Sequence, residues 1–448
     1  MCGITVWYDG SDTIQRISHR GKRIRGQFYN GINFQFTRLP IQGLDERHDQ
    51  PFDNRREIIL FNGEIYNYKE ISSELECDTP LWGGNNDFRI FDGMYSVVKY
   101  DKLSKKTTVI TDRFGKKQLY YRLENGRIVG ICSEIKGLVK PNDKMDSFYL
   151  SRVFKFGYNF SNDKTLVVGI RRFLPGFVYQ IYDGKILSAS AVQWDSSKMC
   201  PLPELMPFYD MMDLAVKRRL VSDVPVSILF SGGLDSSILL HHALKHQPNI
   251  KIFTIENGTD TKYAKRLAKD WNVKIKIIKL KYNQKDYDKI HLANESAVDL
   301  GSVIPQYLLF KEIRKAGYDV ALSADAADEV FGGYKRMESV DCQTSDIIDE
   351  LSFYHFPRLD RMSMAHTVEL RCPFAAQYIV DAGLRLPYYK RIGKRFLKEV
   401  YKTILPSYII DREKEPLKIK SIRDDKVKAR EELAVCWKNK LFKEFVNQ

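Results

Sequence analysis

The stretch VPVSILFSGGLDSSILLHHALK, residues 224–245, decides the fold of the C-terminal half. An apolar run typical of a strand leads into a turn with two glycines, and an apolar helical segment follows. Strand and helix patterns then alternate through KIFTIEN, a helix from Thr261 to Trp271, VKIKIIKL and later DVALSAD. This alternation predicts a doubly wound parallel sheet, which binds ligands at the carboxyl ends of its strands. From Ser345 onward the pattern is mostly helical.

The turn SGGLDSS, Ser231 to Ser237, has the composition of a phosphate-binding loop. Its two glycines permit a tight bend and a close approach of the backbone to a ligand, and serines at a helix N-terminus can donate to phosphate oxygens. Asp235 would repel bare phosphates, so we expect it to hold Mg²⁺, which binds carboxylate and phosphate oxygens together. The motif lacks the Gly-Lys-Ser/Thr ending of a Walker A loop. A plain glycine-rich turn is the alternative interpretation.

The N-terminal part has a different texture. From Gly3 to about Tyr182, short β-rich runs such as GINFQF, EIILFNG and MYSVVKYD are separated by Gly, Asn and Asp turns, which predicts an antiparallel domain. Between Lys185 and Pro207 the chain turns to Ser, Met and three prolines, a composition typical of a connection. We therefore place one domain at residues 2–198 and a second at 199–448.

Composition limits the class of protein. With 448 residues and 44% hydrophobic content, the chain can form two or three globular domains. It has seven scattered cysteines without a C-x-x-C pair, no apolar run long enough to cross a bilayer and no N-terminal leader pattern, so we expect a cytoplasmic protein without disulfides or zinc. The net charge of +14 suits anionic substrates, but no RNA- or DNA-binding signature accompanies it.

Cys2 follows the initiator methionine in MCGI, and this position changes its chemistry. Removal of Met1 would leave Cys2 with a thiol and a free α-amino group that can act as its own base. The segment FNGEIYNY places Asn62 and Gly63 after an apolar strand, where an amide side chain and a backbone N–H can form an oxyanion hole. A type I′ hairpin turn is the alternative for Asn62–Gly63, and a buried structural thiol is the alternative for Cys2.

These motifs together resemble the asparagine synthetase B family of class II glutamine amidotransferases. The matching segments are MCGI, HRG at His19 to Gly21, NGEIYN, DRFGKKQLYY, SEIKGL, SGGLDSS and LDRMSMAHTVELRCPF, and they occur in the family's order. SGGLDSS resembles the PP-loop of ATP pyrophosphatases. The resemblance implies an N-terminal Ntn-hydrolase αββα sandwich and a C-terminal sheet of the PP-loop, adenine nucleotide alpha hydrolase-like type.

The resemblance also implies roles for single residues. It makes Cys2 the nucleophile, Asn62 and Gly63 the oxyanion hole, Asp325 the acceptor of a proton from ammonia, and Lys414 a stabiliser of the acyl-phosphate charge. The implied glutamine-binding residues are Arg38, Ile41, Asn62, Glu64 and Asp78. The implied ATP-binding residues are Leu229, Ser231, Gly232, Gly233, Asp235, Ser236, Ile255, Ser323 and Ala324. Asp235 and Asp328 would coordinate Mg²⁺.

The implied activity joins two half-reactions. Glutamine is hydrolysed to glutamate and ammonia, and ATP, giving AMP and pyrophosphate, adenylates a carboxylate that ammonia converts to an amide. Aspartate is the default acceptor, so the expected partners are small-molecule substrates, with no membrane; a homodimer is one expectation for the assembly. The alternatives are the same chemistry on a carboxylate of a sugar, peptide or modified base, or a catalytically silent relative that binds nucleic acid.

The chain departs from the family pattern at two places that bear on the acceptor. SADAADE, Ser323 to Glu329, stands where the family reads SGEGSDE or SGDGGDE, so methyl groups narrow the space and an alanine is strained wherever φ is positive. Ala376 removes a carboxylate that would meet an α-ammonium group. Arg371 and Lys414 are basic candidates for the acceptor's carboxylate, and Glu369 or Asp325 are acidic candidates for its ammonium.

Overall fold

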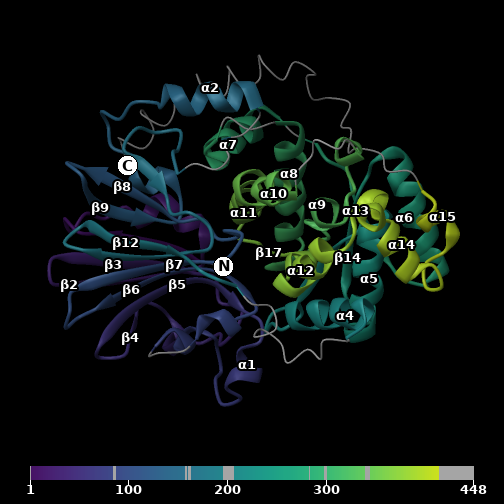
Figure 1. Cartoon of the computed structure of the whole chain (residues 1–448), viewed down its shortest axis with the longest axis horizontal. Coiled ribbons are helices and arrows are strands. Elements are labelled where there is room, and N and C mark those ends of the chain that lie inside the picture. The colour runs from purple at the N-terminus through teal and green to yellow at the C-terminus, as the bar shows by residue number, and fades with distance from the viewer. Residues whose placement is uncertain are drawn as a thin grey trace.

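The protein is an antiparallel two-sheet sandwich followed by a parallel sheet surrounded by helices, side by side along the longest axis (Figure 1). This computed structural model describes residues 2–83, 87–156, 159, 163–194, 206–281, 283–296, 300–338 and 344–412. The predicted boundary at residue 198, and Lys414, lie outside these ranges. In the part of the chain described, no helix is long and apolar enough to cross a membrane.

The first sheet of the sandwich has six strands in the order β10-β8-β9-β1-β3-β2, and each pair of neighbours is antiparallel. Its strands are β1 (Gly3–Trp7), β2 (Arg23–Tyr29), β3 (Ile32–Arg38), β8 (Tyr120–Glu124), β9 (Arg127–Cys132) and β10 (Ile170–Arg172). The strand that follows Cys2 therefore lies inside the sheet, with β9 and β3 on either side.

The second sheet also has six antiparallel strands, in the order β12-β11-β7-β6-β5-β4. Its strands are β4 (Phe52–Asp53), β5 (Glu57–Ile65), β6 (Gly93–Asp101), β7 (Lys106–Thr111), β11 (Phe177–Tyr182) and β12 (Lys185–Ala191). Asn62 and Gly63 pair with Ser96 and Tyr95 inside the β5–β6 ladder. The hairpin-turn alternative for Asn62–Gly63 is therefore wrong.

The two sheets pack face to face, and short helices cover their outer faces. Ile4, Phe36, Leu60 and Val98 are buried between the sheets, which gives the sandwich its own core. The outer face of the first sheet is covered by η1 (Ile14–Arg20), η5 (Ile135–Leu138) and α2 (Ser147–Phe156), and that of the second by α1 (Tyr68–Ile71), η3 (Thr79–Trp82) and η4 (Phe88–Ile90). The layering confirms the expected αββα order with helical layers made of short segments.

The C-terminal sheet has five parallel strands in the order β15-β14-β13-β16-β17. They are β13 (Val226–Leu229), β14 (Lys251–Ile255), β15 (Ile275–Ile278), β16 (Val320–Leu322) and β17 (Glu369–Arg371). From β13 the chain adds strands outward on one side, then returns to add β16 and β17 on the other. The predicted doubly wound sheet is confirmed, and its strand order reverses between β13 and β16.

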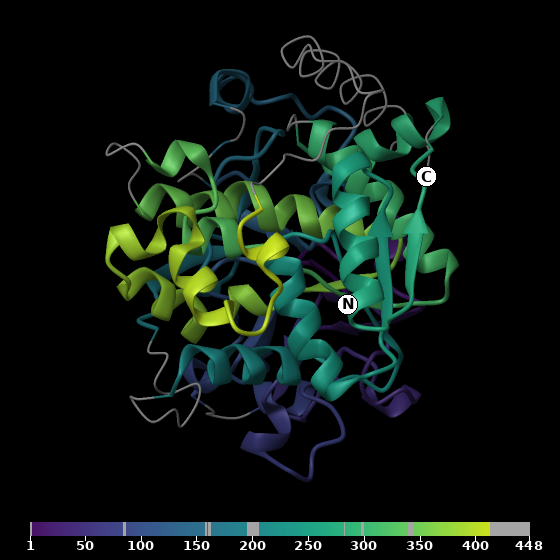
Figure 2. The ribbon, with the colours of Figure 1, turned by 90° about the vertical axis from the view of Figure 1, so that its right-hand side faces the viewer.

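Helices pack around this sheet (Figure 2). They are α4 (Phe208–Arg219), α5 (Leu234–His246), α6 (Gly258–Asp270), α7 (Gln284–Asn294), α8 (Leu300–Lys315), α9 (Ala327–Phe331), α10 (Thr344–Glu350), the π-helical turn η7 (Leu351–His355), α11 (Phe356–Met364), α12 (Gln377–Arg385), α13 (Tyr388–Arg391), α14 (Arg395–Tyr401) and α15 (Ser407–Ile410), with short 3-10 turns η6 (Lys335–Glu338), η8 (Pro373–Ala375) and η9 (Ile392–Lys394). The sequence pattern did not predict β17, because three residues are too few to show an alternation.

Apolar side chains cross from the sandwich into the C-terminal core. Leu39, Ile41 and Phe114 belong to the same buried cluster as the strands and helices of the parallel sheet. Each is 2% exposed or less. The two halves are therefore joined by burial of apolar surface, which holds the two predicted sites in a defined relation.

Candidate active sites

Cys2 lies directly before β1 and is 8% exposed. Its backbone nitrogen donates to Asn62 Oδ1 at 3.1 Å, a contact that joins the two sheets of the sandwich. Burial raises the pKa of the Cys2 thiol, so the resting side chain is protonated. A neutral thiol needs a base beside it to become a nucleophile, which suits a free α-amino group at the same residue.

Asn62 and Gly63, the residues predicted to form an oxyanion hole, lie in β5 beside the backbone nitrogen of Cys2. Asn62 is fully buried, and its Nδ2 donates no hydrogen bond among the described residues, so the amide is free to donate to a ligand. A Cβ on Gly63 would overlap the carbonyl oxygen of Met94, which explains why the position takes glycine. Because Oδ1 of Asn62 already accepts from Cys2, the amide plane is oriented with its donors directed away from that nitrogen.

The two carboxylates expected to hold an α-ammonium group lie together. Glu64 and Asp78 are each 6% exposed, and Asp78 Oδ2 accepts from the backbone N–H of Ile65 at 2.7 Å. Burial raises the pKa of Asp78 to about 7, and burial together with the charges of Glu369 and Asp78 raises the pKa of Glu64. A buried acidic pair with raised pKa values binds a cation well, since the cation removes the cost of ionising them.

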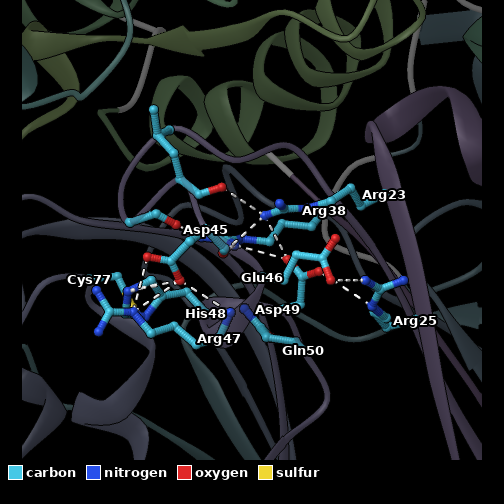
Figure 3. A network of polar contacts seen from close by, with 12 residues as sticks. Arg23, Arg25, Arg38, Asp45, Glu46, Arg47, His48, Asp49, Gln50 and Cys77 are labelled. Atoms are coloured by element: carbon cyan, nitrogen blue, oxygen red, sulfur yellow. Dashed lines mark hydrogen bonds and ion pairs between the residues drawn. The ribbon is translucent and has the colours of Figure 1, made fainter.

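Arg38 ends β3 and lies under a loop of the sandwich (Figure 3). Its guanidinium donates to the carbonyl oxygens of Asp45, Gln42 and Gly43 at 2.9, 2.8 and 2.5 Å and to Asp49 Oδ1 at 2.9 Å. The loop holds the cation in place. A ligand carboxylate reaches these donors only by replacing some of those contacts.

Ile41 lies between the two halves. Its side chain is 1% exposed within the C-terminal core cluster, and its carbonyl oxygen accepts from the backbone N–H of Asp223 at 2.8 Å. The structure thus gives Ile41 a part in joining the halves, beside the glutamine-binding role that the sequence resemblance implies.

The residues expected to bind ATP gather at the carboxyl edge of the parallel sheet. Leu229 ends β13, Ile255 ends the neighbouring β14, and Ser323 follows β16 on the other side. The SGGLDSS turn therefore lies beside the point where the strand order reverses, which is where such sheets bind ligands. Gly232 has φ +75°, and a Cβ at this position would overlap the backbone of Ala264, so the position favours glycine.

Hydrogen bonds from serine side chains stabilise the SGGLDSS turn. Ser231 Oγ lies 3.0 Å from Ser236 Oγ and accepts from the N–H of Gly233 at 3.3 Å. Ser237 Oγ donates to the carbonyl oxygen of Gly233 at 2.7 Å. The backbone bend at the N-terminus of α5 is thus stabilised by the hydroxyl groups of its own serines. The positive end of the helix dipole lies at this turn, where it would favour binding of an anion.

Asp235 and Asp328, the predicted Mg²⁺ ligands, face one another across Lys394. Lys394 Nζ lies 2.5 Å from Asp328 Oδ1 and is also paired with Asp235 Oδ2. The two carboxylates come from the first turns of α5 and α9 and converge on one cation. This donor set suits a hard cation, so the residues fit Mg²⁺ provided that the Lys394 ammonium gives way. No sequence motif pointed to Lys394, because it is distant in sequence from both carboxylates.

The residues proposed to bind the acceptor lie in two different surroundings. Asp325 follows β16, and burial raises the pKa of its carboxyl group. Glu369 and Arg371 lie in β17 and face the sandwich instead: Arg371 Nε donates to Glu369 Oε1 at 2.6 Å, and Arg371 Nη2 lies 3.7 Å from Glu64 Oε2. The expectation that Glu369 and Arg371 meet the acceptor is not supported by these contacts, which direct both side chains toward the glutamine-binding carboxylates.

Of the alanines that depart from the family pattern, four are buried and Ala324 is partly buried. Ala375 and Ala376 are 0% exposed within the C-terminal core, so no charged group could replace either without a buried partner. Ala326 has φ +80°, the strained left-handed region, and caps α9. The strain that the sequence comparison anticipated for SADAADE is therefore present at Ala326.

Known proteins show where these two sites occur together. The asparagine synthase family model matches residues 208–356 and 342–436, and the glutamine amidotransferase domain model matches residues 1–191. The probable glutamine-hydrolysing asparagine synthetase of Acanthamoeba polyphaga mimivirus is 26% identical over 85% of this chain and 75% of its own length. The corresponding enzymes of Mus musculus and Homo sapiens are 26% identical over 93% of this chain and 83% of theirs. A solved glutamine phosphoribosylpyrophosphate amidotransferase from B. subtilis aligns with 64% of this chain and 70% of its own at 12% identity, with a TM-score of 0.29, which is too low to support an inference.

The backbone of Ala326 yields a stability prediction. Ala326→Gly relieves about 1–2 kcal/mol of left-handed strain, which offsets the loss of a methyl group, so we expect the free energy of unfolding to change by less than about 1 kcal/mol. Ala327→Gly is the matched control, because Ala327 is fully buried and begins the regular helix; it should lower the free energy by about 1–2 kcal/mol. Urea denaturation measures both, and equal losses would contradict the strain.

Proposed function

Since this chain belongs to the asparagine synthase family and is a glutamine amidotransferase, we propose that it transfers ammonia from glutamine to an ATP-activated carboxylate, most simply aspartate. The family implies that glutamine and ATP are its substrates. The observation that carries the proposal is the pair of built sites: a buried thiol with a free amide donor in the sandwich, and a phosphate-binding turn with two facing carboxylates in the parallel sheet.

In the first half-reaction, Cys2 Sγ attacks the side-chain carbonyl carbon of glutamine. The α-amino group exposed by removal of Met1 takes the thiol proton and returns it to the leaving ammonia. Asn62 Nδ2 and the N–H of Gly63 donate to the oxyanion of the tetrahedral intermediate. Water then hydrolyses the thioester to release glutamate, while Arg38, Glu64 and Asp78 hold the two charged groups at the α-carbon.

In the second half-reaction, the acceptor carboxylate attacks the α-phosphorus of ATP and pyrophosphate leaves. Ser231, Gly233 and Ser236 present donors to the phosphates at the N-terminus of α5. Asp235 and Asp328 would hold Mg²⁺, which when bound neutralises phosphate charge. In this proposal Asp325 takes a proton from ammonia as the ammonia attacks the acyl adenylate, and the raised pKa of Asp325 supports this role, because it suits a proton acceptor better than the pKa of an ordinary carboxylate.

A cavity between the two sites supports the transfer of ammonia inside the protein. It has a volume of about 20 Å³, and its lining includes Tyr66, Met94, Lys116 and Cys372. Tyr66 lies two residues beyond Glu64, and Cys372 Sγ lies 3.4 Å from Ser323 Oγ, so the cavity joins the surroundings of both sites. A space of this size admits about one small molecule at a time.

The acceptor is the least determined part of the proposal. The relatives are named asparagine synthetases, so aspartate is the first candidate acceptor. Ala376 is buried and carries no charge, and Glu369 and Arg371 are directed toward Glu64, so fewer charged groups remain to bind an α-amino acid. A different carboxylate is the second candidate for this reason.

Cys2→Ala should abolish glutamine-dependent synthesis and leave synthesis from ammonium salts intact, because the second site does not use the thiol. Amide product and AMP are measured with each nitrogen source. Cys77→Ala is the matched control, since that thiol is also buried and lies in the sandwich. Intact-mass data showing that active protein retains Met1 would contradict the role of the amino group as base.

Asp78 predicts a pH dependence of glutamine binding. Its pKa is raised to about 7, so the carboxylate is mostly ionised at pH 8 and mostly protonated at pH 6. Because only the ionised form attracts the α-ammonium group, the KM for glutamine should be about ten-fold higher at pH 6 than at pH 8. Asp78→Asn should have a high KM at both values, whereas Asp101→Asn, a surface control, keeps the wild-type profile. Glutaminase assays across this range test it. An unchanged profile in Asp78→Asn would assign the titration to the Cys2 amine.

The reaction itself is tested with a panel of carboxylates. At saturating ATP and glutamine, aspartate should support formation of AMP, pyrophosphate and asparagine, with a KM raised by the missing charged contact, which is worth about 1.5–3 kcal/mol. Turnover with another carboxylate but not with aspartate would retain the amidotransferase reaction and reject asparagine as product. No turnover with any carboxylate would reject the second half-reaction.

A further inference from the structure

A second cavity, distinct from the one between the two sites, lies where the sandwich meets the helices of the C-terminal half. Its volume is about 40 Å³, room for about three water molecules or one carboxylate or phosphate group. The side chains that matter here come from both halves: Tyr120, Tyr149 and Arg172 from the sandwich, and Tyr354, Arg358 and Arg361 from η7 and α11.

Arg172 is the key residue of this cavity. It ends β10, is 6% exposed, and its Nη2 has no hydrogen-bond partner among the described residues. Its guanidinium lies 4.8 Å from the ring centre of Phe353, which orients the cation without neutralising it. Burial lowers the pKa of Arg172 to about 10, the direction expected for a cation that lacks a counter-charge.

Two further guanidinium groups line the cavity. Arg358 is 7% exposed; its Nη1 donates to Ser302 Oγ at 2.8 Å, and its Nε has no partner among the described residues. Arg361 Nη1 donates to the carbonyl oxygen of Asn294 at 2.7 Å. Three buried arginines therefore meet in one small space.

Negative charge is scarce around them. The described residues that line the cavity include no Asp or Glu. Glu295 partly compensates Arg361, because it lies 3.8 Å from Arg361 Nε and raises the pKa of that guanidinium, while its two oxygens also accept from the backbone N–H groups of Ile135 and Lys136 at 2.9 Å each. Buried charge without a partner is strongly unfavourable, so this excess of cations points to an anion that comes from outside the protein.

The cavity adjoins the chemistry assigned to the acceptor. Arg358 Nη2 lies 3.2 Å from His355 Nδ1, and His355 Nε2 lies 3.1 Å from Glu329 Oε1 in SADAADE. Arg358 also acts electrostatically on Asp325, where its charge opposes the effect of burial. The same arginine thus faces the cavity and the segment proposed to take a proton from ammonia.

We propose that this cavity binds a small oxyanion, carboxylate or phosphate, and that in the working enzyme this is the second anionic group of the acceptor substrate. The second part rests on the proposed function. Guanidinium forks bind either oxyanion through paired hydrogen bonds. Tyr120, Tyr149 and Tyr354 line the same cavity. The acceptor would then be a dicarboxylate or a phosphorylated carboxylate, bound across both halves of the chain.

The first experiment measures thermal unfolding of the full chain with succinate, with inorganic phosphate and with chloride at matched ionic strength. Succinate and phosphate should each raise Tm by about 3 °C or more over chloride, because a ligand that binds only the folded state stabilises it. Arg172→Met should remove the rise with succinate. Arg171→Met is the matched control: Arg171 precedes Arg172 on β10, and its side chain pairs with Asp163 at 2.7 Å outside the cavity lining.

The outcomes are separate. A Tm rise with succinate in wild type and Arg171→Met, absent in Arg172→Met, supports the oxyanion site; a rise that survives in Arg172→Met, or no rise in wild type, overturns it. Phosphate can also bind at the SGGLDSS turn, so only the part of the phosphate-induced Tm rise that is lost in Arg172→Met is assigned to the cavity. If Arg172→Met does not fold, Arg358→Met carries the same comparison from the other wall.

Kinetics identify the source of the anion. A KM for the acceptor at least ten-fold higher in Arg172→Met, with the KM for glutamine unchanged in the glutaminase reaction, supports the acceptor as ligand. An unchanged acceptor KM together with the lost Tm effect overturns that assignment in favour of a free anion. If no carboxylate is turned over at all, the proposed function fails while the Tm result still decides whether the cavity binds an oxyanion.

Discussion

Arg20 joins Cys2, the proposed nucleophile, to the other half of the molecule, and it is fully buried. Its Nε donates to the carbonyl oxygen of Cys2 at 2.9 Å, and its two terminal nitrogens pair with Glu134 at 2.7 Å and with Asp360 of α11 at 2.9 Å. Lys117 completes the group by donating to Asp360 at 3.0 Å. A buried charge of this kind is tolerated only when every partner is in place, so the segment that leads from Cys2 into β1 cannot move independently of helix α11 without a cost of about 3–5 kcal/mol.

The same dependence on distant partners appears in both sites. In the sandwich, the carboxylates Glu64 and Asp78 would repel each other, and the nearest compensating charge is Arg371 from the parallel sheet. In the parallel sheet, Asp235 and Asp328 are held together by Lys394 from the helical C-terminal region. At each of the two proposed sites, therefore, two carboxylates lie close together and a resident cation stabilises the pair.

The sequence was most informative where function depends on a short contiguous stretch. SGGLDSS, with an apolar strand before it and a helix after it, predicted the turn at the carboxyl edge of the sheet, and alternation of patterns predicted a parallel sheet and an antiparallel domain. Asn62–Gly63 was ambiguous between a hairpin turn and an oxyanion hole, because Asn-Gly favours both. Only the pairing of β5 with β6, which runs straight through these two residues, removed the turn.

What the sequence by itself determined is that an antiparallel domain precedes a parallel sheet, and it supplied Cys2 and SGGLDSS as the candidates for a nucleophile and a phosphate-binding turn. What only the tertiary structure decided is which cations are buried and what each of them contacts, as for Arg20, Lys394, Arg371 and Arg172. The physical reason is that the sequence does not distinguish a buried lysine or arginine from the many exposed ones. The role of such a residue depends on its burial and on the carboxylates that it contacts across the fold. Arg20 meets Asp360 and Lys394 meets Asp235 across more than one hundred positions of sequence, and no local pattern records such contacts.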